Sequence, residues 1–200
     1  MDAAHWGLAG LLALGLAASV GLNTFLPLLM LAVAAHFHLA GVTLNAELAW
    51  MGSDTALVVL ALATALELIG DKVPAVDHAL HAVGTVARPA AGWLIATSAL
   101  GASVDPATAA IIGLMIGAPT AFGFHAAKSS TRALATGTTL GAINPFLSAF
   151  EDLLALALAL LSFIAPLLVP IALGVIIIVF LRLTHAVRRR LAARPPWRAA

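Results

Sequence analysis

"LLALALALLSFIAPLLVPIALGVIIIVFL", residues 153–181, is a long run of sequence without a single charged side chain. The run is longer than the roughly 20 apolar residues that cross a bilayer as one helix, and Pro166 divides it in two. Only helices and closed barrels satisfy every backbone group in lipid, and this run lacks the alternation of barrel strands. It therefore predicts two spanning helices of an all-α transmembrane bundle.

The composition of the whole chain agrees with this prediction. Of its 200 residues, 62% are hydrophobic and 10% are charged, and the mean hydropathy is +1.06. Soluble domains are only about 45–50% apolar. The chain contains no cysteine, which excludes disulfides and thiolate metal sites. These values predict a polytopic membrane protein.

Dividing the chain at charges, Pro, Gly and Asn predicts about seven spanning helices in a single transmembrane domain, residues 1–187. The predicted helices cover residues 5–22, 24–40, 55–71, 89–102, 107–126, 146–164 and 167–187. Residues 188–200 are predicted to form a basic cytoplasmic tail. We interpret the tail as a determinant of topology and expect no nucleic-acid partner.

The basic residues predict the orientation. Residues 1–71 contain no Lys or Arg, and most of the ten such residues lie after residue 181. Because cytoplasmic loops and tails are enriched in Lys and Arg, we expect the C-terminus in the cytoplasm and the N-terminus outside. The expected location is the bacterial inner membrane. The expected partners are the lipid bilayer and a small anionic substrate or lipid headgroup, and a homo-oligomer is left open.

Residues 73–88 and 129–145 are left without a spanning assignment, and each follows a lysine. Lys72 precedes Arg88-Pro89 by the same spacing that separates Lys128 from Asn144-Pro145. The spacing predicts an internal repeat with units 55–102 and 111–158, and matching broken helices are typical of transport sites. Chance is the alternative, since only two points match. Each segment is either an amphipathic helix in the headgroup layer or a re-entrant segment lining a cavity.

The stretch "ELIGDKVPAVDHALHAVGTVARP", residues 67–89, concentrates charge. At helical spacing Asp77, His81 and Arg88 share one face. Glu67 and Asp71 are four residues apart and share a face of the preceding helix. An ionised side chain at the centre of a bilayer costs about 2.5–3.5 kcal/mol. The structural alternative for Glu67 is an ion pair with Lys128 or Arg132.

A second charged constellation lies at residues 125–152. His125, Lys128 and Arg132 share one helix face, and Glu151 and Asp152 lie near the start of an apolar helix. The adjacent carboxylates resemble a proton or cation relay, although two acids that complement a helix dipole are equally simple. Metal chelation by His125 with the carboxylates is opposed by the neighbouring cations.

Two asparagines mark breaks in apolar sequence, Asn23 in "GLNTFL" and Asn144 in "AINPFL". Unwound backbone capped by Asn can bind an ion or a headgroup at a helix terminus. A tight turn between two helices of a hairpin is the alternative at Asn23. Both interpretations place polar groups between apolar segments.

The motifs "ELIGDKVPAVDHALHAVGTVARPAAG", "HAAKSSTRALA" and "SAFEDLLALALAL", in this order, resemble a bacterial multipass membrane family catalogued only as a domain of unknown function. The resemblance covers about residues 15–187. It implies that the charged residues of these motifs belong to one shared design, and it implies no activity.

We therefore expect a small membrane transporter or lipid-headgroup translocase for a phosphate- or carboxylate-bearing substrate, coupled to a proton or cation. The residues expected to bind the substrate are Lys72, Arg88, Lys128, Arg132, Asn23 and Asn144. Those expected to carry the coupling ion are Glu67, Asp71, Asp77, His81, His125, Glu151 and Asp152. The alternatives are a scaffold with a charged cytoplasmic partner surface and a metal-ion transporter. The chain has no nucleotide-binding, zinc-protease or nucleophile-elbow motif, so we expect neither an enzyme nor a cofactor.

Overall fold

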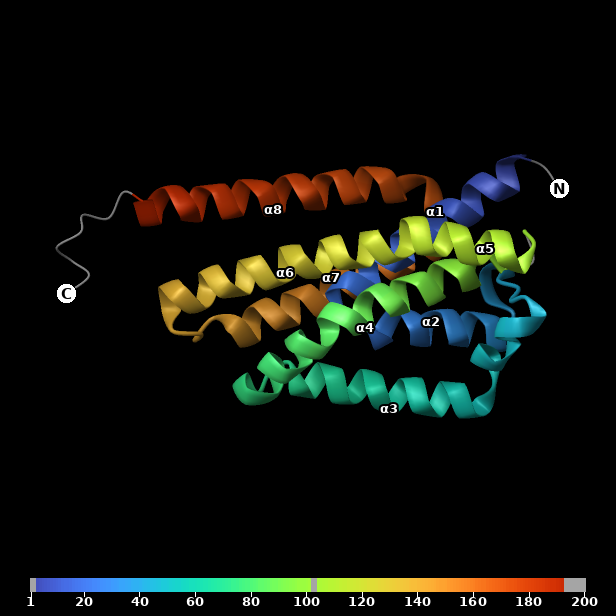
Figure 1. The fold of residues 1–200 in the computed structure, drawn as a ribbon, viewed down its shortest axis with the longest axis horizontal. Helices are drawn as coiled ribbons and strands as arrows, with labels where there is room; N and C mark the ends of the chain where they lie inside the picture. Colours follow the sequence, from blue (N-terminus) through green and yellow to red (C-terminus); the bar gives the residue numbers. More distant parts are fainter. Residues whose placement is uncertain (1–2, 102–103, 193–200) are drawn as a thin grey trace.

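The computed structural model describes residues 3–101 and 104–192, and it contains no strand in these ranges (Figure 1). The all-α prediction is confirmed. The α-helices are α1 (Ala3–Leu22), α2 (Phe25–His36), α3 (Asp54–Gly70), α4 (Pro74–Leu100), α5 (Pro106–Ile112), α6 (Ala118–Thr139), α7 (Asn144–Ile164) and α8 (Val169–Ala192). The shorter elements are η1 (Leu39–Gly41), η2 (Ala46–Gly52), a π-helical turn η4 (Gly113–Gly117) and η5 (Pro166–Leu168).

Three helical stretches are long and apolar enough to cross a membrane: Pro106–Thr139, Asn144–Ile164 and Pro166–Ala186. A fourth is available if η2 and α3, which are bent by 60° at their junction, count as one span. These helices are typical of a membrane protein. The count of seven spans stays a prediction, and most of the predicted tail, residues 188–200, lies outside the described residues.

The starts of several helices follow from local sequence. The side chains of Asn45, Ser53 and Asp105 accept hydrogen bonds from backbone N–H groups at the starts of η2, α3 and α5. Such caps satisfy donors that have no partner within the helix. Hydrogen bonds from the side chain and backbone of Thr108 also hold the pKa of the Asp105 carboxyl below its usual value. Pro106 occupies the first turn of α5, where its missing N–H costs nothing.

The first two helices form a hairpin whose tip lies inside the bundle. In Figure 1, α1 and α2 both lie between the right-hand end and the middle of the molecule. With 12 residues, α2 is about 18 Å long, too short to cross a hydrocarbon core of about 30 Å. The tip residues Asn23 and Thr24 are buried, and Asn23 Oδ1 accepts a hydrogen bond from the Leu26 N–H at 3.0 Å. The prediction of one helix over residues 24–40 is therefore wrong beyond His36.

Two predicted helix boundaries are also wrong. Residues 73–88 and 89–102 are not separate segments, because α4 continues through Pro89. Residues 107–126 and 129–145 are likewise joined over most of their length, since helix runs from Pro106 to Thr139. The boundaries had been drawn at charges and at proline. Charges interrupt an apolar run without ending a helix when their partners lie inside the protein, and neighbouring helices make proline tolerable within a bundle.

The proposed repeat units place equivalent residues in different local structures. Lys72 lies in the turn between α3 and α4, whereas Lys128 lies within α6. Pro89 lies inside α4, whereas Pro145 occupies the first turn of α7. Equal spacing therefore does not correspond to equal structure at these four positions. The repeat with units 55–102 and 111–158 stays a prediction from spacing.

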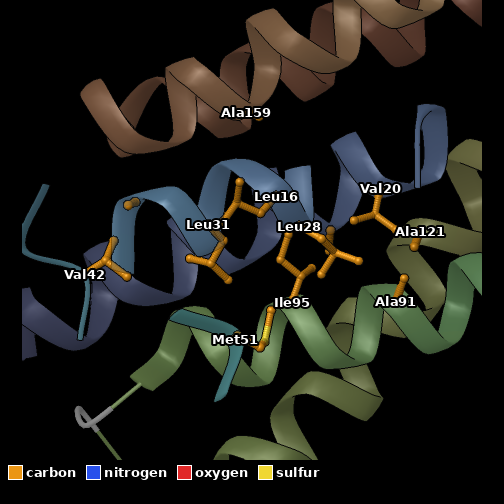
Figure 2. Packing of buried hydrophobic residues seen from close by; sticks show 12 residues of the cluster. Leu16, Val20, Leu28, Leu31, Val42, Met51, Ala91, Ile95, Ala121 and Ala159 are labelled. Carbon is orange, nitrogen blue, oxygen red and sulfur yellow. The ribbon is translucent and has the colours of Figure 1, made fainter. Parts of the chain in front are cut away.

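The apolar core fills the space between α1, α2, α4 and α7, and α8 lies along one side of the bundle (Figure 1). Figure 2 shows Leu16 of α1, Leu31 of α2 and Ile95 of α4 directed toward one another. All three side chains are fully buried. This core holds the tip of the α1–α2 hairpin against α4 and α6.

Small residues bring α4 against the start of α6. A Cβ added to Gly92 would lie 2.6 Å from the carbonyl oxygen of Gly117, too close for any real side chain. Small residues at such crossings are typical of helix packing in membranes. The crossing sets the distance between the charged faces of α4 and α6, which lie farther along the same helices.

We expect Gly92→Val to separate these helices and to destabilise the protein by about 1–3 kcal/mol, the usual cost of overpacking. The measurement is thermal unfolding of the purified protein in detergent. Gly123→Val is the matched control, because a Cβ at Gly123 meets no atom within 4 Å. An equal loss of stability in both variants would contradict this account of the crossing.

Candidate functional site: a buried charge network

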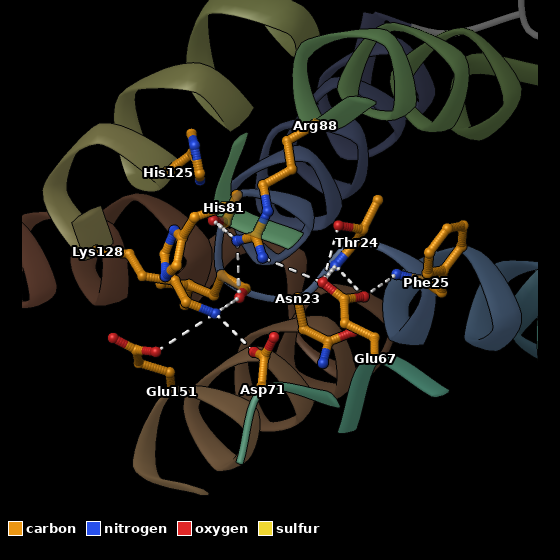
Figure 3. A network of polar contacts seen from close by, with 12 residues as sticks. Asn23, Thr24, Phe25, Glu67, Asp71, His81, Arg88, His125, Lys128 and Glu151 are labelled. Carbon is orange, nitrogen blue, oxygen red and sulfur yellow. Dashed lines mark hydrogen bonds and ion pairs between the residues drawn. The ribbon is translucent and has the colours of Figure 1, made fainter. Parts of the chain in front are cut away.

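The charged residues predicted from the sequence converge at the tip of the α1–α2 hairpin (Figure 3). Their side chains come from α3, α4, α6, α7 and the α3–α4 turn. The buried members are Glu67, Asp71, Asp77, Arg88, Lys128, Arg132, Glu151 and Asp152, each at most 9% exposed. The charged faces of α4 and α6 thus meet each other inside the protein.

The N-terminus of α2 holds the carboxylate of Glu67. Its oxygens accept hydrogen bonds from the N–H of Thr24 at 3.0 and 2.9 Å, from the Thr24 hydroxyl at 2.9 Å and from the N–H of Phe25 at 3.0 Å. Arg88 Nη2 donates to the same carboxylate at 3.1 Å. Free N–H groups and the helix dipole make a helix N-terminus an anion site. We call these donors of Thr24, Phe25 and Arg88 the anion cradle.

The C-terminus of α1 lies opposite and attracts cations. Arg88 Nη1 donates to the carbonyl oxygens of Gly21 and Leu22, and Lys128 Nζ donates to that of Leu22 at 2.8 Å. Cations complement the negative end of a helix dipole. Gly21 lets α6 pack closely against this end of α1, since a Cβ there would lie 2.5 Å from the Ala121 carbonyl oxygen. The broken α1–α2 backbone therefore binds an anionic group on one side and two cationic groups on the other.

A second set of ion pairs joins α6 to α7 and to the α3–α4 turn. Lys128 Nζ lies 3.1 Å from Asp71 Oδ2 and 3.3 Å from Glu151 Oε2. Arg132 donates to Glu151 Oε2 from Nε at 3.1 Å and from Nη2 at 2.7 Å, and its Nη1 donates to Asp77. Charge-assisted pairs of this kind are strong and directional. Each of the two cations therefore bridges carboxylates that belong to different elements of the fold.

Lys72 and Asp152 lie at the edge of the network. Lys72 Nζ donates to Asp152 Oδ2 at 3.0 Å, and Asn23 Nδ2 donates to Asp152 Oδ1 at 3.0 Å. The Lys72 side chain is 40% exposed. Asn23 thus connects the hairpin tip to α7, while Lys72 closes the network on its more exposed side.

His81 lines a pocket of about 460 Å³ next to the network, and His125 lies beside His81. The rings of His81 and His125 stack with centroids 5.7 Å apart. His81 Nδ1 lies 3.4 Å from the Ser129 hydroxyl, and His125 Nε2 lies 3.5 Å from the Thr85 hydroxyl. The lining includes Asp77, His81, Thr85, Ser129, Arg132 and Asn144. The pocket therefore connects the ion pairs to the surroundings of the protein.

The structure brings the charged residues that the sequence marks together, with a different ion pair at Glu67. Glu67 pairs with Arg88, so the structural alternative of a pair with Lys128 or Arg132 is wrong. Asn144 lies at the pocket rim, where its Nδ2 donates to Thr136 Oγ1 at 2.9 Å, and it is not part of the ion pairs. Among the side chains that the structure describes, no three of His, Cys, Asp or Glu are grouped to hold a metal ion.

Thr24 is the functional residue that sequence reasoning missed. Its N–H group and its hydroxyl are two of the four donors to Glu67, and the other two are the N–H of Phe25 and the guanidinium of Arg88. Its position after Asn23, immediately before an apolar helix, was the available signal, because threonine favours helix starts. A break in an apolar run thus also marked an anion-binding helix terminus.

A comparison with protein families matches residues 11–186 to the family described as "Domain of unknown function (DUF4126)". Neither the curated proteins nor the solved structures include a match to this chain. The match covers every residue of the charge network.

Proposed function

The chain belongs to the family described as Domain of unknown function (DUF4126), and we propose that it is a small multipass transporter or lipid-headgroup translocase for an anionic group. The substrate would carry phosphate or carboxylate, and a proton or cation would be coupled to its movement. The proposed setting is the bacterial inner membrane, with the C-terminus in the cytoplasm and the N-terminus outside.

The observation that carries the proposal is the anion cradle occupied by the protein's own Glu67. The carboxylate receives two backbone N–H groups, a hydroxyl and a guanidinium while only 3% of its side chain is exposed. Any planar carboxylate or phosphate oxygen pair of similar size meets the same donors. Glu67 therefore acts as the resting occupant that an anionic substrate displaces.

The helix break supports transport rather than static binding. Discontinuous helices whose termini face a buried site are the structural mark of many secondary transporters. Here the N-terminus of α2 binds the anionic group, and the C-terminus of α1 binds Arg88 and Lys128. A movement of this hairpin would change the anion cradle and both cations together. Substrate entry and rearrangement of the ion pairs are thus linked through one element.

The scaffold alternative requires charged side chains on the surface. Arg88, Lys128 and Arg132 are at most 4% exposed, and each has carboxylate or carbonyl partners within the protein. Such side chains offer little charge to a cytoplasmic partner. The burial of these three residues therefore favours the transporter proposal.

Removal of the resting occupant tests the proposal. We expect Glu67→Ala to empty the anion cradle, so that added acetate or phosphate stabilises the variant by RT ln(1 + [L]/Kd), about 2.7 kcal/mol at 100 times Kd. The measurement is thermal unfolding in detergent against anion concentration, with chloride at equal ionic strength as the reference. The wild type, whose cradle is filled, should respond far less.

Two further variants are controls for this experiment. Asp54→Ala removes a carboxylate that is 93% exposed and should respond like the wild type. Glu67→Gln retains a planar occupant and should give a weaker response than Glu67→Ala. An equal response of wild type, Asp54→Ala and Glu67→Ala to acetate and phosphate would overturn the proposed anion site.

Proteoliposomes then test flux: wild-type protein should carry phosphate or acetate inward along a proton gradient, and Glu67→Ala should not.

A further inference from the structure

The buried network holds unequal numbers of acids and bases. Among the described side chains, five carboxylates meet four cations. The carboxylates are Glu67, Asp71, Asp77, Glu151 and Asp152, and the cations are Lys72, Arg88, Lys128 and Arg132. An uncompensated charge inside an apolar protein costs several kcal/mol. A further positive charge is therefore expected in the network.

We infer that the network binds one exchangeable proton, shared by Asp77 and His81 at the mouth of the polar pocket. The inference deepens the proposed function and rests on it for the role of the proton in coupling. Binding of the proton itself is measurable without any transport.

The geometry of this pair supports the assignment. His81 Nε2 is buried without a hydrogen-bond partner and lies 3.6 Å from Asp77 Oδ1. A proton placed between these two atoms gives His81 Nε2 a partner and gives Asp77 Oδ1, which already accepts from Arg132, a second one. Both residues line the pocket of about 460 Å³, and the His81 side chain is 21% exposed. Water in that pocket can deliver and remove the proton.

The other carboxylates are better compensated. Glu67 has four donors in the anion cradle, and Asp152 has Lys72 and Asn23. Glu151 lies against both Lys128 and Arg132. Asp77 has only Nη1 of Arg132, whose other two nitrogens are engaged by Glu151. Oε1 of Glu151 also lacks a hydrogen-bond partner, but among the network carboxylates Asp77 is the one that lines the pocket.

The charged and titratable groups around the pair act in both directions. From α6, Arg132, Lys128 and His125 face His81, and Arg88 lies on the same helix as the pair. These cations oppose a full charge on the imidazole. Asp71 of the α3–α4 turn and Glu151 of α7 favour an added positive charge. Burial and the three cations therefore oppose a separate imidazolium, which is why the inferred proton is shared with the Asp77 carboxylate.

The shared proton would couple the movement of the anion to the movement of a proton. An anionic substrate entering the network adds a second negative charge, which a low-dielectric site opposes. A bound proton removes one of these charges, so the protonated network accepts the anion more readily. We therefore expect proton and anion to move together.

Asp77→Asn tests the inference, because it leaves four carboxylates against four cations and removes the proton site. A proton held more tightly by the folded than by the unfolded protein stabilises at low pH, and this stability is lost as pH rises. We expect the folding equilibrium of the wild type to weaken as the pH rises and the bound proton is lost, by up to about tenfold per pH unit for one proton. In Asp77→Asn this dependence should disappear, together with the infrared band of a protonated carboxyl group.

Controls make each outcome decisive. Asp54→Asn, at an exposed carboxylate, should retain the wild-type pH dependence. His81→Gln keeps a polar side chain and should shift the loss of the infrared band to a different pH if Asp77 and His81 share the proton. An infrared band that persists in Asp77→Asn, or a folding equilibrium of the wild type that is independent of pH, would overturn the inference. If the proton is found but Glu67→Ala shows no anion response, the inference stands and the proposed function fails.

Discussion

Replacing Arg88 by methionine is expected to destabilise the protein by about 3–5 kcal/mol, the usual cost of leaving one partner of a buried ion pair alone. Arg88 is 2% exposed, and its guanidinium contacts Glu67 together with the carbonyl oxygens of Gly21 and Leu22. Methionine fills much of the same space but donates no hydrogen bond. The variant therefore leaves the Glu67 carboxylate without its cationic partner. It also removes the hydrogen bonds that Arg88 donates to the carbonyl oxygens at the C-terminus of α1.

Unfolding of the purified protein in mixed micelles measures this effect. The double variant Arg88→Met/Glu67→Gln separates the ion pair from packing, because it removes both charges and leaves an acceptor for the N–H groups of Thr24 and Phe25. We expect the double variant to regain a large part of the lost stability, since neutral replacement of a buried pair is often well tolerated. Two single losses that simply add in the double variant would show that Arg88 and Glu67 do not interact energetically.

A loss of similar size, about 3–5 kcal/mol, is expected for Lys128→Met. Lys128 is fully buried, and its ammonium contacts Asp71, Glu151 and the carbonyl oxygen of Leu22. Removing it leaves two carboxylates in the apolar bundle with Arg132 as their remaining cation. Because Lys128 joins α6 to α7 and to the hairpin tip, the variant should also loosen the packing of α1 against α6.

Lys72→Met is the matched control for this prediction. Lys72 also pairs with a carboxylate at 3.0 Å, but its side chain is 40% exposed. Exposed pairs contribute only about 0–1 kcal/mol, so this variant should remain close to the wild type in unfolding measurements. Equal destabilisation by Lys72→Met and Lys128→Met would contradict the distinction between the edge and the centre of the network.

The candidate site was predictable as a set of residues because charge is conspicuous in such an apolar sequence. Ionised groups within apolar segments are costly, so their presence alone marks a site. Spacing then assigned His125, Lys128 and Arg132 correctly to one helix face. Which acid meets which base was not predictable, since helical periodicity gives the direction of a side chain relative to its own helix only. The pairing of Glu67 with Arg88 depends on how α3 and α4 approach the hairpin tip.

The sequence by itself determined that this chain is an all-helical bundle of apolar segments with a concentrated set of charges. Both properties follow from local terms, the transfer free energy of side chains and the requirement for internal backbone hydrogen bonds. Only the tertiary structure decided that α4 continues through Pro89, that helix runs from Pro106 to Thr139, and that the α1–α2 hairpin ends inside the bundle. These features depend on contacts between residues far apart in sequence, where buried partners stabilise charges and backbone ends that local sequence would treat as breaks.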